Sequence, residues 1–279
     1  MKRLLLTVVV LVLSVPSCAH RCGGRCERRE TLAQVSTIDA LLAGDYDGKL
    51  PCSDLLRYGG FGIGTFHGLD GEMVVLDGTV YQVDVAGKVT AMPRDTRTPF
   101  ACVTSFEPDV RLLVRPKPEM YMPKSGGEEV VARTGLDFAG LRKLVDEKAG
   151  EPNLFLAVRV DGTFKHVKTR SVPAQTKPYP PLVEVTKRQA TFEFKDVKGT
   201  IVGFRCPAFV KGVNVPGYHL HFLTADRRGG GHVLELTMER GVIGADVTPN
   251  FLLMLPRGGA FAELDLTTDR EKDLHRAER

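Results

Sequence analysis

The sequence predicts a β-rich α+β (mixed α/β) fold, in which mixed and antiparallel sheets form two closely packed lobes with few helices. Three observations lead to this class. Most of the chain after residue 60 consists of short apolar runs of strand length, separated by turn residues. Two Asp-Gly pairs, at 77–78 and 161–162, stand between such runs and are typical of hairpin turns. One clear helix, at about residues 135–148, interrupts the strands.

The first 19 residues are predicted to be a secretory signal peptide rather than part of the fold. Two basic residues precede the apolar run 4–13, and small residues follow it at 17–19. The run is too short to span a bilayer comfortably. Its end has two readings: a signal peptidase cuts after Ala19, or residues 15–18 form a bacterial lipobox in which Cys18 is lipidated. Both predict an exported protein, periplasmic or secreted, and the second predicts a membrane-anchored lipoprotein.

Residues 20–30 are expected to form a flexible linker. Cys22 and Cys26 lie in this basic, glycine-containing segment, and their spacing lacks the paired arrangement of a zinc knuckle. A local disulfide or free thiols therefore explains them better than a metal site. Export makes disulfides feasible, but removal of Cys18 from the six cysteines leaves an odd number.

Charge and hydropathy argue against a nucleic-acid partner and against a membrane-spanning helix after the signal segment. The 279 residues carry a formal net charge of +4, without a basic stripe that has aromatic residues interleaved. The sequence therefore predicts no nucleic-acid partner. No apolar run after the signal segment is long enough to be a membrane helix.

The first elements of the folded part are predicted from apolar spacing and turn residues. Residues 31–42 have apolar side chains at helical spacing. Ser53 is the expected cap of a short helix that ends at Tyr58. Strands at 73–76 and 80–85 flank the first Asp-Gly pair.

The later elements follow from the same signals. Residues 115–134, rich in proline, glycine and charge, are interpreted as a long loop or insertion. The helix at about 135–148 has apolar residues on one face and Lys and Glu on the other. The charged tail 265–279 is expected to be helical in part. The remaining predicted strands are 154–160, 164–172, 190–194, 200–205, 218–223, 232–238, 241–247 and 250–255.

Three of the chain's seven histidines lie around one glycine-rich turn. His219 and His221 project from the same face of a strand, because residues two apart share a face. If the next strand pairs with the first, His232 lies close to His221. Three imidazoles with an open position are the ligand set of a catalytic zinc site, although another divalent transition metal can occupy the same donors. A solvated or hydrogen-bonded cluster is the alternative.

Two charged residues could face this metal, but spacing alone does not decide. Glu72 follows the Asp70-Gly71 turn and is either an exposed carboxylate at a strand start or a proton donor held near a metal. Arg170 shares a strand face with Lys168 and His166, and that face either binds an anionic substrate or is solvated. The isolated His67 and His166 are expected to be structural or exposed.

Several longer motifs resemble those of the acetolactate decarboxylase family, in the same order and over nearly the whole chain after Thr31. They are Gly60-Phe-Gly, Gly64-Thr-Phe, Leu69-Asp-Gly-Glu72, Asn153-Leu-Phe, Arg159-Val-Asp-Gly, Val167-Lys-Thr-Arg170, Lys177-Pro-Tyr-Pro, Gly199-Thr-Ile-Val-Gly-Phe, Gly217-Tyr-His-Leu-His-Phe and Gly230-Gly-His232. Residues 1–19 and 115–134 depart from the family pattern.

This resemblance implies an activity and a set of site residues. The activity is the metal-dependent conversion of the small molecule (S)-2-acetolactate to (R)-acetoin and carbon dioxide, in acetoin and butanediol formation, by a chain that is usually a homodimer. It implies zinc held by His219, His221 and His232. The catalytic positions it implies are Glu72, Arg170, Thr65 and, near the C-terminus, Glu278.

The chain is expected to have an N-terminal β-rich lobe, residues 31–155. A C-terminal lobe, residues 156–279, is expected to carry the metal site. Two rival functions stay open. One is a zinc hydrolase or hydratase that uses a metal-bound hydroxide. The other is a non-catalytic metal-binding lipoprotein of the cell envelope, which needs no buried Glu72 or Arg170 beside the metal.

Overall fold

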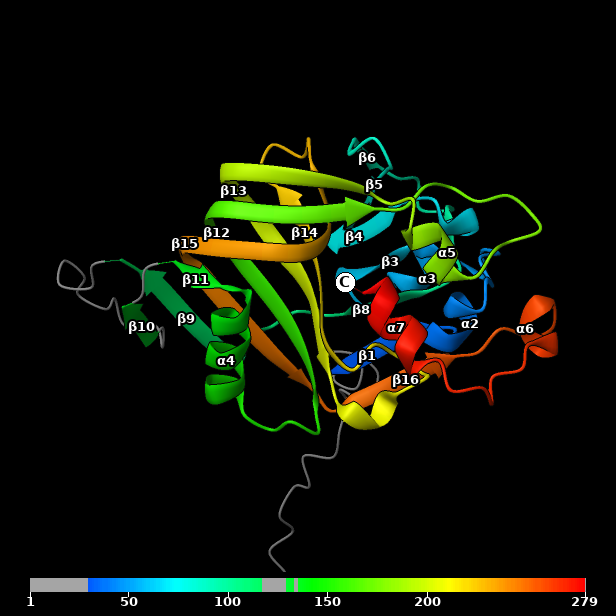
Figure 1. Ribbon diagram of the computed structural model, residues 1–279. Coiled ribbons are helices and arrows are strands. Elements are labelled where there is room, and N and C mark those ends of the chain that lie inside the picture. Colours follow the sequence, from blue (N-terminus) through cyan, green and yellow to red (C-terminus); the bar gives the residue numbers. More distant parts are fainter. Residues whose placement is uncertain (1–29, 117–128, 133–134, 279) are drawn as a thin grey trace, which may run out of the picture.

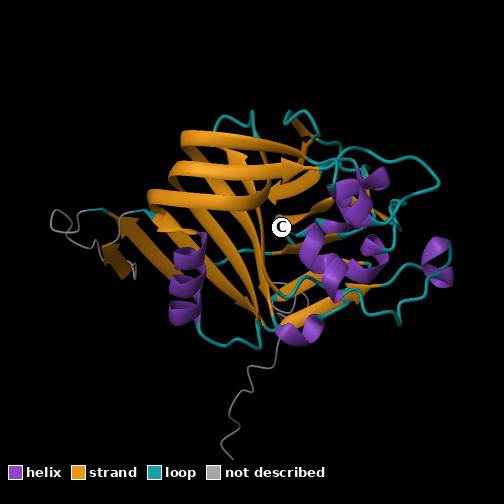
Figure 2. Ribbon diagram, viewed as in Figure 1, coloured by secondary structure: helices purple, strands orange, loops and turns teal. Residues whose placement is uncertain are grey.

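The computed structural model describes residues 30–116, 129–132 and 135–278. The predicted signal peptide, the predicted linker with Cys22 and Cys26, and most of the predicted loop lie outside these residues. In the described part of the chain, two seven-stranded sheets pack together and the helices are few and short (Figure 1, Figure 2). The predicted β-rich class with few helices is therefore confirmed.

The first sheet contains strands from both ends of the described chain. Its order is β16-β1-β8-β3-β4-β5-β6. Most neighbours are antiparallel, but β1 pairs in parallel with β16. The strands are β1 (Thr31–Val35), β3 (Phe61–Thr65), β4 (Glu72–Leu76), β5 (Thr79–Val83), β6 (Val89–Ala91), β8 (Ala101–Thr104) and β16 (Asn250–Met254).

The second sheet has the order β10-β9-β15-β12-β13-β14, and β11 pairs with β15. An additional pairing of β14 with β15 closes the four strands β12 to β15 on themselves, and these strands curl strongly (Figure 1). The strands are β9 (Val110–Arg115), β10 (Glu129–Ala132), β11 (Leu136–Asp137), β12 (Phe155–Ser171), β13 (Ala190–Cys206), β14 (Gly217–Thr224) and β15 (Gly230–Thr248).

Neither sheet corresponds to one half of the chain. The strands β9 to β11 and the helix α4 (Phe138–Ala149) precede residue 155, yet they belong with the second sheet. Strand β16 follows residue 155 but belongs to the first sheet. The expected division into residues 31–155 and 156–279 therefore does not coincide with the boundary between the sheets.

The other elements are short. They are α2 (Ile38–Leu42), α3 (Cys52–Leu55), the 3₁₀ turns η1 (His67–Leu69) and η3 (Ala208–Val210), α5 (Leu182–Thr186), α6 (Ala260–Glu263), α7 (Glu271–Ala277) and the two-stranded pair β2 (Leu50–Pro51) with β7 (Arg97–Thr98). The prediction that the charged tail is helical in part is confirmed by α7.

The segment 31–42 is a strand followed by a short helix, so the prediction of one helix was wrong. β1 pairs on both sides, with β16 and β8. Ser36 then adopts a φ of 60°, and the Thr37 side chain caps α2. A strand that is buried on both faces has no polar alternation. Apolar residues on both faces of β1 therefore matched a helical spacing by coincidence, although β1 pairs with two other strands.

The first Asp-Gly pair forms the predicted hairpin between β4 and β5. Asp77 and Gly78 have φ values of 51° and 77°, and both positions of a type I′ turn require a positive φ. The predicted strands 218–223 and 250–255 and the predicted helix 135–148 are confirmed as β14, β16 and α4.

The second Asp-Gly pair forms no turn, contrary to the prediction. β12 runs without a break through Asp161 and Gly162, which pair with β13 and β15. A Cβ atom on Gly162 would lie 2.5 Å from the carbonyl oxygen of Arg240. The glycine is therefore needed for the close approach of the neighbouring strand.

Other boundaries were also wrong. α3 has Pro51 rather than Ser53 at its N-cap and ends at Leu55. The strands predicted at 190–194 and 200–205 are one strand, β13, and those at 232–238 and 241–247 are one strand, β15. Residues 129–132, predicted as loop, form β10 in parallel with β9. Charged residues on the outer face of a long strand thus resembled breaks between short ones.

The hydrophobic core has two main parts. One lies between the sheets and includes Leu32 and Ile63 from the first sheet and Phe204 from the second. The other lies inside the curled second sheet, where the rings of Phe164 and Phe222 meet edge to face at 5.5 Å. No helix within the described residues is long and apolar enough to cross a membrane.

One buried carboxyl is expected to reduce stability at neutral pH. Asp246 on β15 is 5% exposed and accepts a hydrogen bond from the backbone N–H of Glu107 at 2.9 Å. Burial, with Asp109, Glu107 and Glu30 nearby, raises the pKa of Asp246 from 3.8 to about 7. Between these two pH values the folded chain keeps a proton that the unfolded chain has released, so stability falls as the pH rises.

Asp246→Asn is therefore expected to stabilise the protein at pH 8 by roughly 1–2 kcal/mol, which allows for solvent screening. The amide oxygen can still accept the Glu107 hydrogen bond, but the buried charge is gone. Melting curves at pH 8 and pH 4 provide the measurement. The melting temperature should rise at pH 8 and stay unchanged at pH 4, and an equal rise at both values would exclude the titration of Asp246 as the cause.

Candidate active site

The three histidines come together as their spacing predicted. Strand alternation on β14 places His219 and His221 on one face, and the register of β14 against β15 puts His221 directly opposite His232. The nearest ring nitrogens lie within 4.8 Å of one another, and the Nε2 atoms of His219 and His221 are 3.2 Å apart. Three imidazoles therefore point to one small volume.

The protonation states suit a cation. Burial lowers the pKa of His219 to about 3. Burial also lowers the pKa of His221 and of His232 well below the usual value, and the neighbouring Arg170 and imidazoles add to the effect. All three rings are therefore neutral near pH 7, and each keeps a lone pair that can bind a metal.

The first sheet orients one of these rings. His221 is 1% exposed, and its Nδ1 lies 2.8 Å from the carbonyl oxygen of Met73 on β4. A carbonyl can only accept, so Nδ1 carries the proton and Nε2 keeps its lone pair toward the other histidines. A backbone carbonyl in this place is a usual partner of a metal-binding histidine. The donor set thus fits a divalent transition metal.

Glu72 and Arg170 form a buried ion pair beside the histidines. Glu72 begins β4, and Arg170 lies near the end of β12, opposite His232 on β15. Their Oε1 and Nη1 atoms are 2.7 Å apart, with the side chains 7% and 6% exposed. The other oxygen of Glu72 is 3.5 Å from Nε2 of His221.

Burial raises the pKa of Glu72 to about 7, while Arg170 opposes the shift and Glu278 adds to it. This carboxyl can therefore hold or release a proton near neutral pH.

The C-terminal helix brings Glu278 into the same site. This residue caps the end of α7, and its Oε2 lies 3.8 Å from the Nε2 atoms of both His219 and His232. Burial raises the pKa of Glu278 to about 7, and Arg170 opposes the shift. Arg170 also donates from Nη2 to the carbonyl oxygen of Ala277 at 2.9 Å, which ties the helix to the site.

Thr65, the last residue of β3, also lines the site. It pairs with Glu72 across the hairpin and is 4% exposed. Its hydroxyl donates to the carbonyl oxygen of Gly71 at 2.7 Å, so the hydroxyl oxygen keeps a lone pair for another donor.

An apolar wall completes a narrow cavity of about 30 Å³ around these groups. Its members lie on α2, η1 and α5 and beside the strands, and they are Ile38, Leu41, Leu69, Phe100, Val172 and Leu182. Sequence reasoning missed this wall. The single local signal was the place of Val172, two residues after Arg170 and just beyond the end of β12.

The other charged residues that the sequence singled out lie elsewhere. Lys168 pairs with Glu235 at 3.0 Å, and His166 is 3.8 Å from Glu193 on the exposed side of the sheet. Of the predicted basic face, only Arg170 reaches the cavity. His67 accepts a hydrogen bond at Nδ1 from the backbone N–H of Gly48, which agrees with a structural role.

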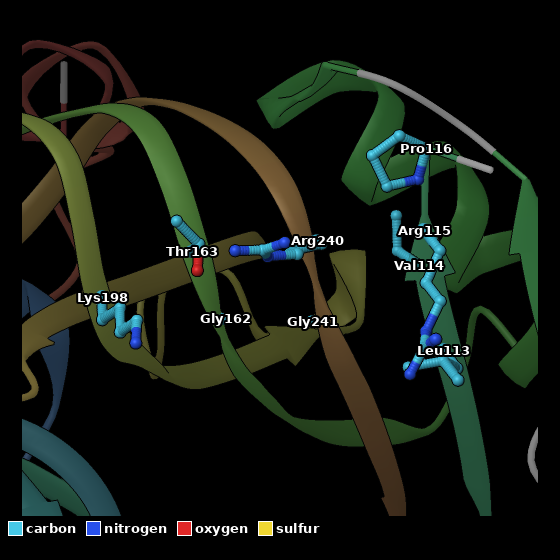
Figure 3. Close-up of a pocket in the computed structure, with 9 residues that line it drawn as sticks. All are labelled: Leu113, Val114, Arg115, Pro116, Gly162, Thr163, Lys198, Arg240 and Gly241. Carbon is cyan, nitrogen blue, oxygen red and sulfur yellow. The ribbon is translucent and has the colours of Figure 1, made fainter.

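A larger hollow, of about 820 Å³, opens on another part of the second sheet (Figure 3). Arg115, Lys198 and Arg240 stand around it, with Gly162 and Gly241 between them. No histidine or carboxylate lines this hollow among the described residues, so its described lining offers no metal-ligand set.

Comparison with known proteins agrees with this geometry. The family model described as alpha-acetolactate decarboxylase matches residues 32–124 and 120–268. The alpha-acetolactate decarboxylase of Methanosarcina mazei is 47% identical over 90% of this chain and 81% of the relative. That of Methylococcus capsulatus is 43% identical over 88% of this chain and 87% of the relative.

The crystal structure of alpha-acetolactate decarboxylase from Bacillus subtilis strain 168 superposes with a TM-score of 0.80. It is 37% identical and covers 89% of this chain and 99% of the solved one. The chain therefore belongs to the alpha-acetolactate decarboxylase family.

Proposed function

We propose that this chain catalyses the metal-dependent decarboxylation of (S)-2-acetolactate to (R)-acetoin and carbon dioxide. The observation that carries the proposal is the buried ion pair of Glu72 and Arg170, at 2.7 Å, beside three converging histidines. Desolvation of two opposite charges is costly, and buried charged groups with shifted pKa values cluster at functional sites. A protein that only stored metal would have no need of this pair, so the enzyme is favoured over the envelope metal-binding lipoprotein.

His219, His221 and His232 are the residues that would hold the cation, with zinc as the first candidate and another divalent transition metal as the alternative. A bound cation supplies a Lewis acid that attracts electron density from the substrate oxygens while carbon dioxide leaves. The protein's part is to present three neutral imidazoles, which the dry surroundings favour, while the Met73 carbonyl fixes which ring nitrogen of His221 carries the proton.

Arg170 is assigned to bind and orient the substrate carboxylate. One Nη1 hydrogen is used on Glu72 and one Nη2 hydrogen on Ala277, and Nε is buried without a partner among the described residues. The guanidinium carries five N–H donors, so others remain for an anion. The contacts with Glu72 and Ala277 fix the orientation of the guanidinium plane before substrate arrives.

The loss of carbon dioxide leaves an electron pair on carbon, and that carbon must receive a proton on one face. Glu72 and Glu278 are the candidates for this donation. Each has a pKa raised to about 7, so each is protonated in part of the molecules at neutral pH. Thr65 can accept a hydrogen bond at the edge of the cavity, because its own hydroxyl hydrogen is donated to Gly71.

A metal assay and a product assay on one purified sample test the function. The expected result is one divalent ion per chain, release of carbon dioxide and (R)-acetoin from (S)-2-acetolactate, loss of activity with a chelator, and recovery when metal is restored. A zinc hydrolase or hydratase would instead give no acetoin. Full turnover after complete removal of the metal would contradict the metal dependence.

The Glu278 carboxyl is expected to matter more than other acidic groups of the same helix. Glu278→Gln keeps the shape of the side chain but removes its acidic proton, and turnover should fall about 10²-fold. Glu271→Gln is the matched control, because Glu271 is on α7 but pairs with Lys211 on the surface. Steady-state rates for the two variants provide the comparison, and equal rates would remove Glu278 from the proton transfer.

Two further assignments rest on the sequence and the family. The chain is proposed to be exported through residues 1–19, with either cleavage after Ala19 or lipidation of Cys18, and to form a homodimer. Mass spectrometry of the N-terminal peptide of the mature protein distinguishes a free N-terminus at residue 20 from a lipid-modified Cys18. Light scattering of the purified chain gives the oligomeric state.

A further inference from the structure

The backbone around Glu72 is held from two sides by side chains of the second sheet. His221 donates from Nδ1 to the carbonyl oxygen of Met73, the residue after Glu72. Ser171 donates from Oγ to the carbonyl oxygen of Val83 at 2.8 Å, and Val83 is the partner of Glu72 in the pairing of β4 with β5. These two hydrogen bonds therefore join the sheets on either side of the carboxylate.

Ser171 also follows Arg170 directly on β12. The Ser171–Val83 hydrogen bond thus connects the strand that carries the guanidinium to the strand that lies opposite the carboxylate. Ser171 and Val83 are both 0% exposed, so water does not compete for the hydroxyl or the carbonyl. A Cβ atom on Gly71 would lie 2.3 Å from the Val83 oxygen, which shows how closely β4 and β5 approach at this point.

Two other buried hydroxyls, one on β12 and one in the first sheet, do not make such a bridge. Thr169, two residues earlier on β12, donates to the carbonyl oxygen of Gly230 within the second sheet. Thr104 donates to the carbonyl oxygen of Ser105 at the end of β8 in the first sheet. Neither bond connects the two sheets, so its loss would not directly change the distance between Arg170 and Glu72. The Ser171 bridge differs because its two ends lie next to the two members of the ion pair.

We infer that Ser171 is a positioning residue for the reaction proposed above, and that its hydroxyl sets the alignment of Arg170 with Glu72 across the boundary between the sheets. A guanidinium and a carboxylate bind well only when the fork and the oxygens are in line. A displacement of about 1 Å at a reacting group can cost about 10²-fold in rate. Ser171 itself touches no substrate and acts through the pair.

Two variants of equal shape isolate the hydroxyl. Ser171→Thr keeps a hydroxyl, whereas Ser171→Val has a similar shape with a methyl group in place of the hydroxyl, so both add bulk at the same position. The value of kcat/KM should be about tenfold lower for Ser171→Val than for Ser171→Thr, while the metal content stays equal. In an Arg170→Lys background, which lacks the planar fork, this ratio should shrink below about threefold because coupled residues are not additive.

Equal kcat/KM for the two variants would overturn the inference, and so would a tenfold ratio that persists unchanged with Arg170→Lys. If neither enlarged side chain is tolerated, Ser171→Ala serves instead, with Thr104→Val as the control for the loss of a buried hydroxyl away from the site. Ser171→Ala should lose about tenfold in kcat/KM and Thr104→Val should lose none. An equal loss in the two would indicate general destabilisation and contradict the inference.

Crystal structures provide a readout that does not depend on activity. The contact of Arg170 with Glu72, 2.7 Å here, should be kept in Ser171→Thr and should lengthen in Ser171→Val or Ser171→Ala. An unchanged contact without the hydroxyl would refute the positioning role. If the wild-type protein released no carbon dioxide from acetolactate, the proposed function would be wrong. The distance between Arg170 and Glu72 in the variants would still decide the role of Ser171.

Discussion

Replacement of His221 by alanine is expected to abolish metal binding and turnover together. This ring is 1% exposed, is oriented by the Met73 carbonyl, and lies directly opposite His232. The variant keeps only two imidazoles, and the affinity for metal should fall by more than about 100-fold, the upper range for loss of an outer partner alone. Without the several kcal/mol that a Lewis acid supplies, turnover should fall at least about 10³-fold.

The measurement is metal content after dialysis, together with acetoin production. His166→Ala is the matched control, because His166 is on the same sheet but faces solvent near Glu193. It should keep both metal and activity. If His221→Ala retained one metal per chain and near-normal turnover, the three histidines would not be the metal centre and the proposed function would lose its basis.

The histidine cluster could be predicted because its geometry is local. The period of two along a strand fixes the common direction of His219 and His221, and a short turn returns the next strand beside them. Direct pairing then places His232 opposite His221. No knowledge of the first sheet was needed for any of these steps.

The rest of the site depends on how two sheets pack, which local patterns do not encode. Glu72 and Arg170 are separated by 98 positions in sequence and meet only because β4 and β12 lie at the same boundary between the sheets. Spacing alone did not decide whether Glu72 was an exposed carboxylate or a proton donor, or whether the face of Arg170 bound an anion or was solvated. The roles proposed for them rest on the family resemblance, and their contact is seen in the structure.

The fold shows the same division between local and distant information. The hairpin at Asp77-Gly78 was predicted correctly, since the turn itself requires those two residues. The identical pair at Asp161-Gly162 misled the prediction, because the reason for its glycine is the backbone of Arg240, far along the chain. An Asp-Gly pair therefore indicates a turn only where no distant strand explains the glycine.

Arg170→Ala is the second change with a large expected effect, and it should reduce both activity and stability. The guanidinium binds Glu72 and the carbonyl oxygen of Ala277 at the end of α7. Its loss removes the group assigned to the substrate carboxylate. It also loosens the helix that Glu278 caps. Removal of one such preorganised donor group costs about 10²–10³-fold in kcat. Turnover should fall by at least this factor.

The stability loss should depend on pH with a definite sign. Arg170 lowers the pKa of Glu72 against the effect of burial, so in the variant the pKa of this carboxyl rises above about 7. Above that pH the variant must either bury an unpaired charge or hold a proton, whereas wild type has an ion pair. Breaking a buried pair costs about 3–5 kcal/mol when the remaining group stays charged. The loss should therefore be small at pH 5.5, where Glu72 is protonated in both proteins, and large at pH 8.5.

Arg170→Lys separates the charge from the planar fork. A lysine restores a cation beside Glu72, so most of the stability at pH 8.5 should return, but its point charge cannot reproduce the two directed contacts to Glu72 and Ala277. Turnover should therefore remain well below wild type while the melting temperature recovers. Unfolding curves at both pH values and initial rates on acetolactate test the three proteins side by side. Full turnover by Arg170→Ala would remove this residue from the mechanism, and full turnover by Arg170→Lys would show that charge alone is sufficient.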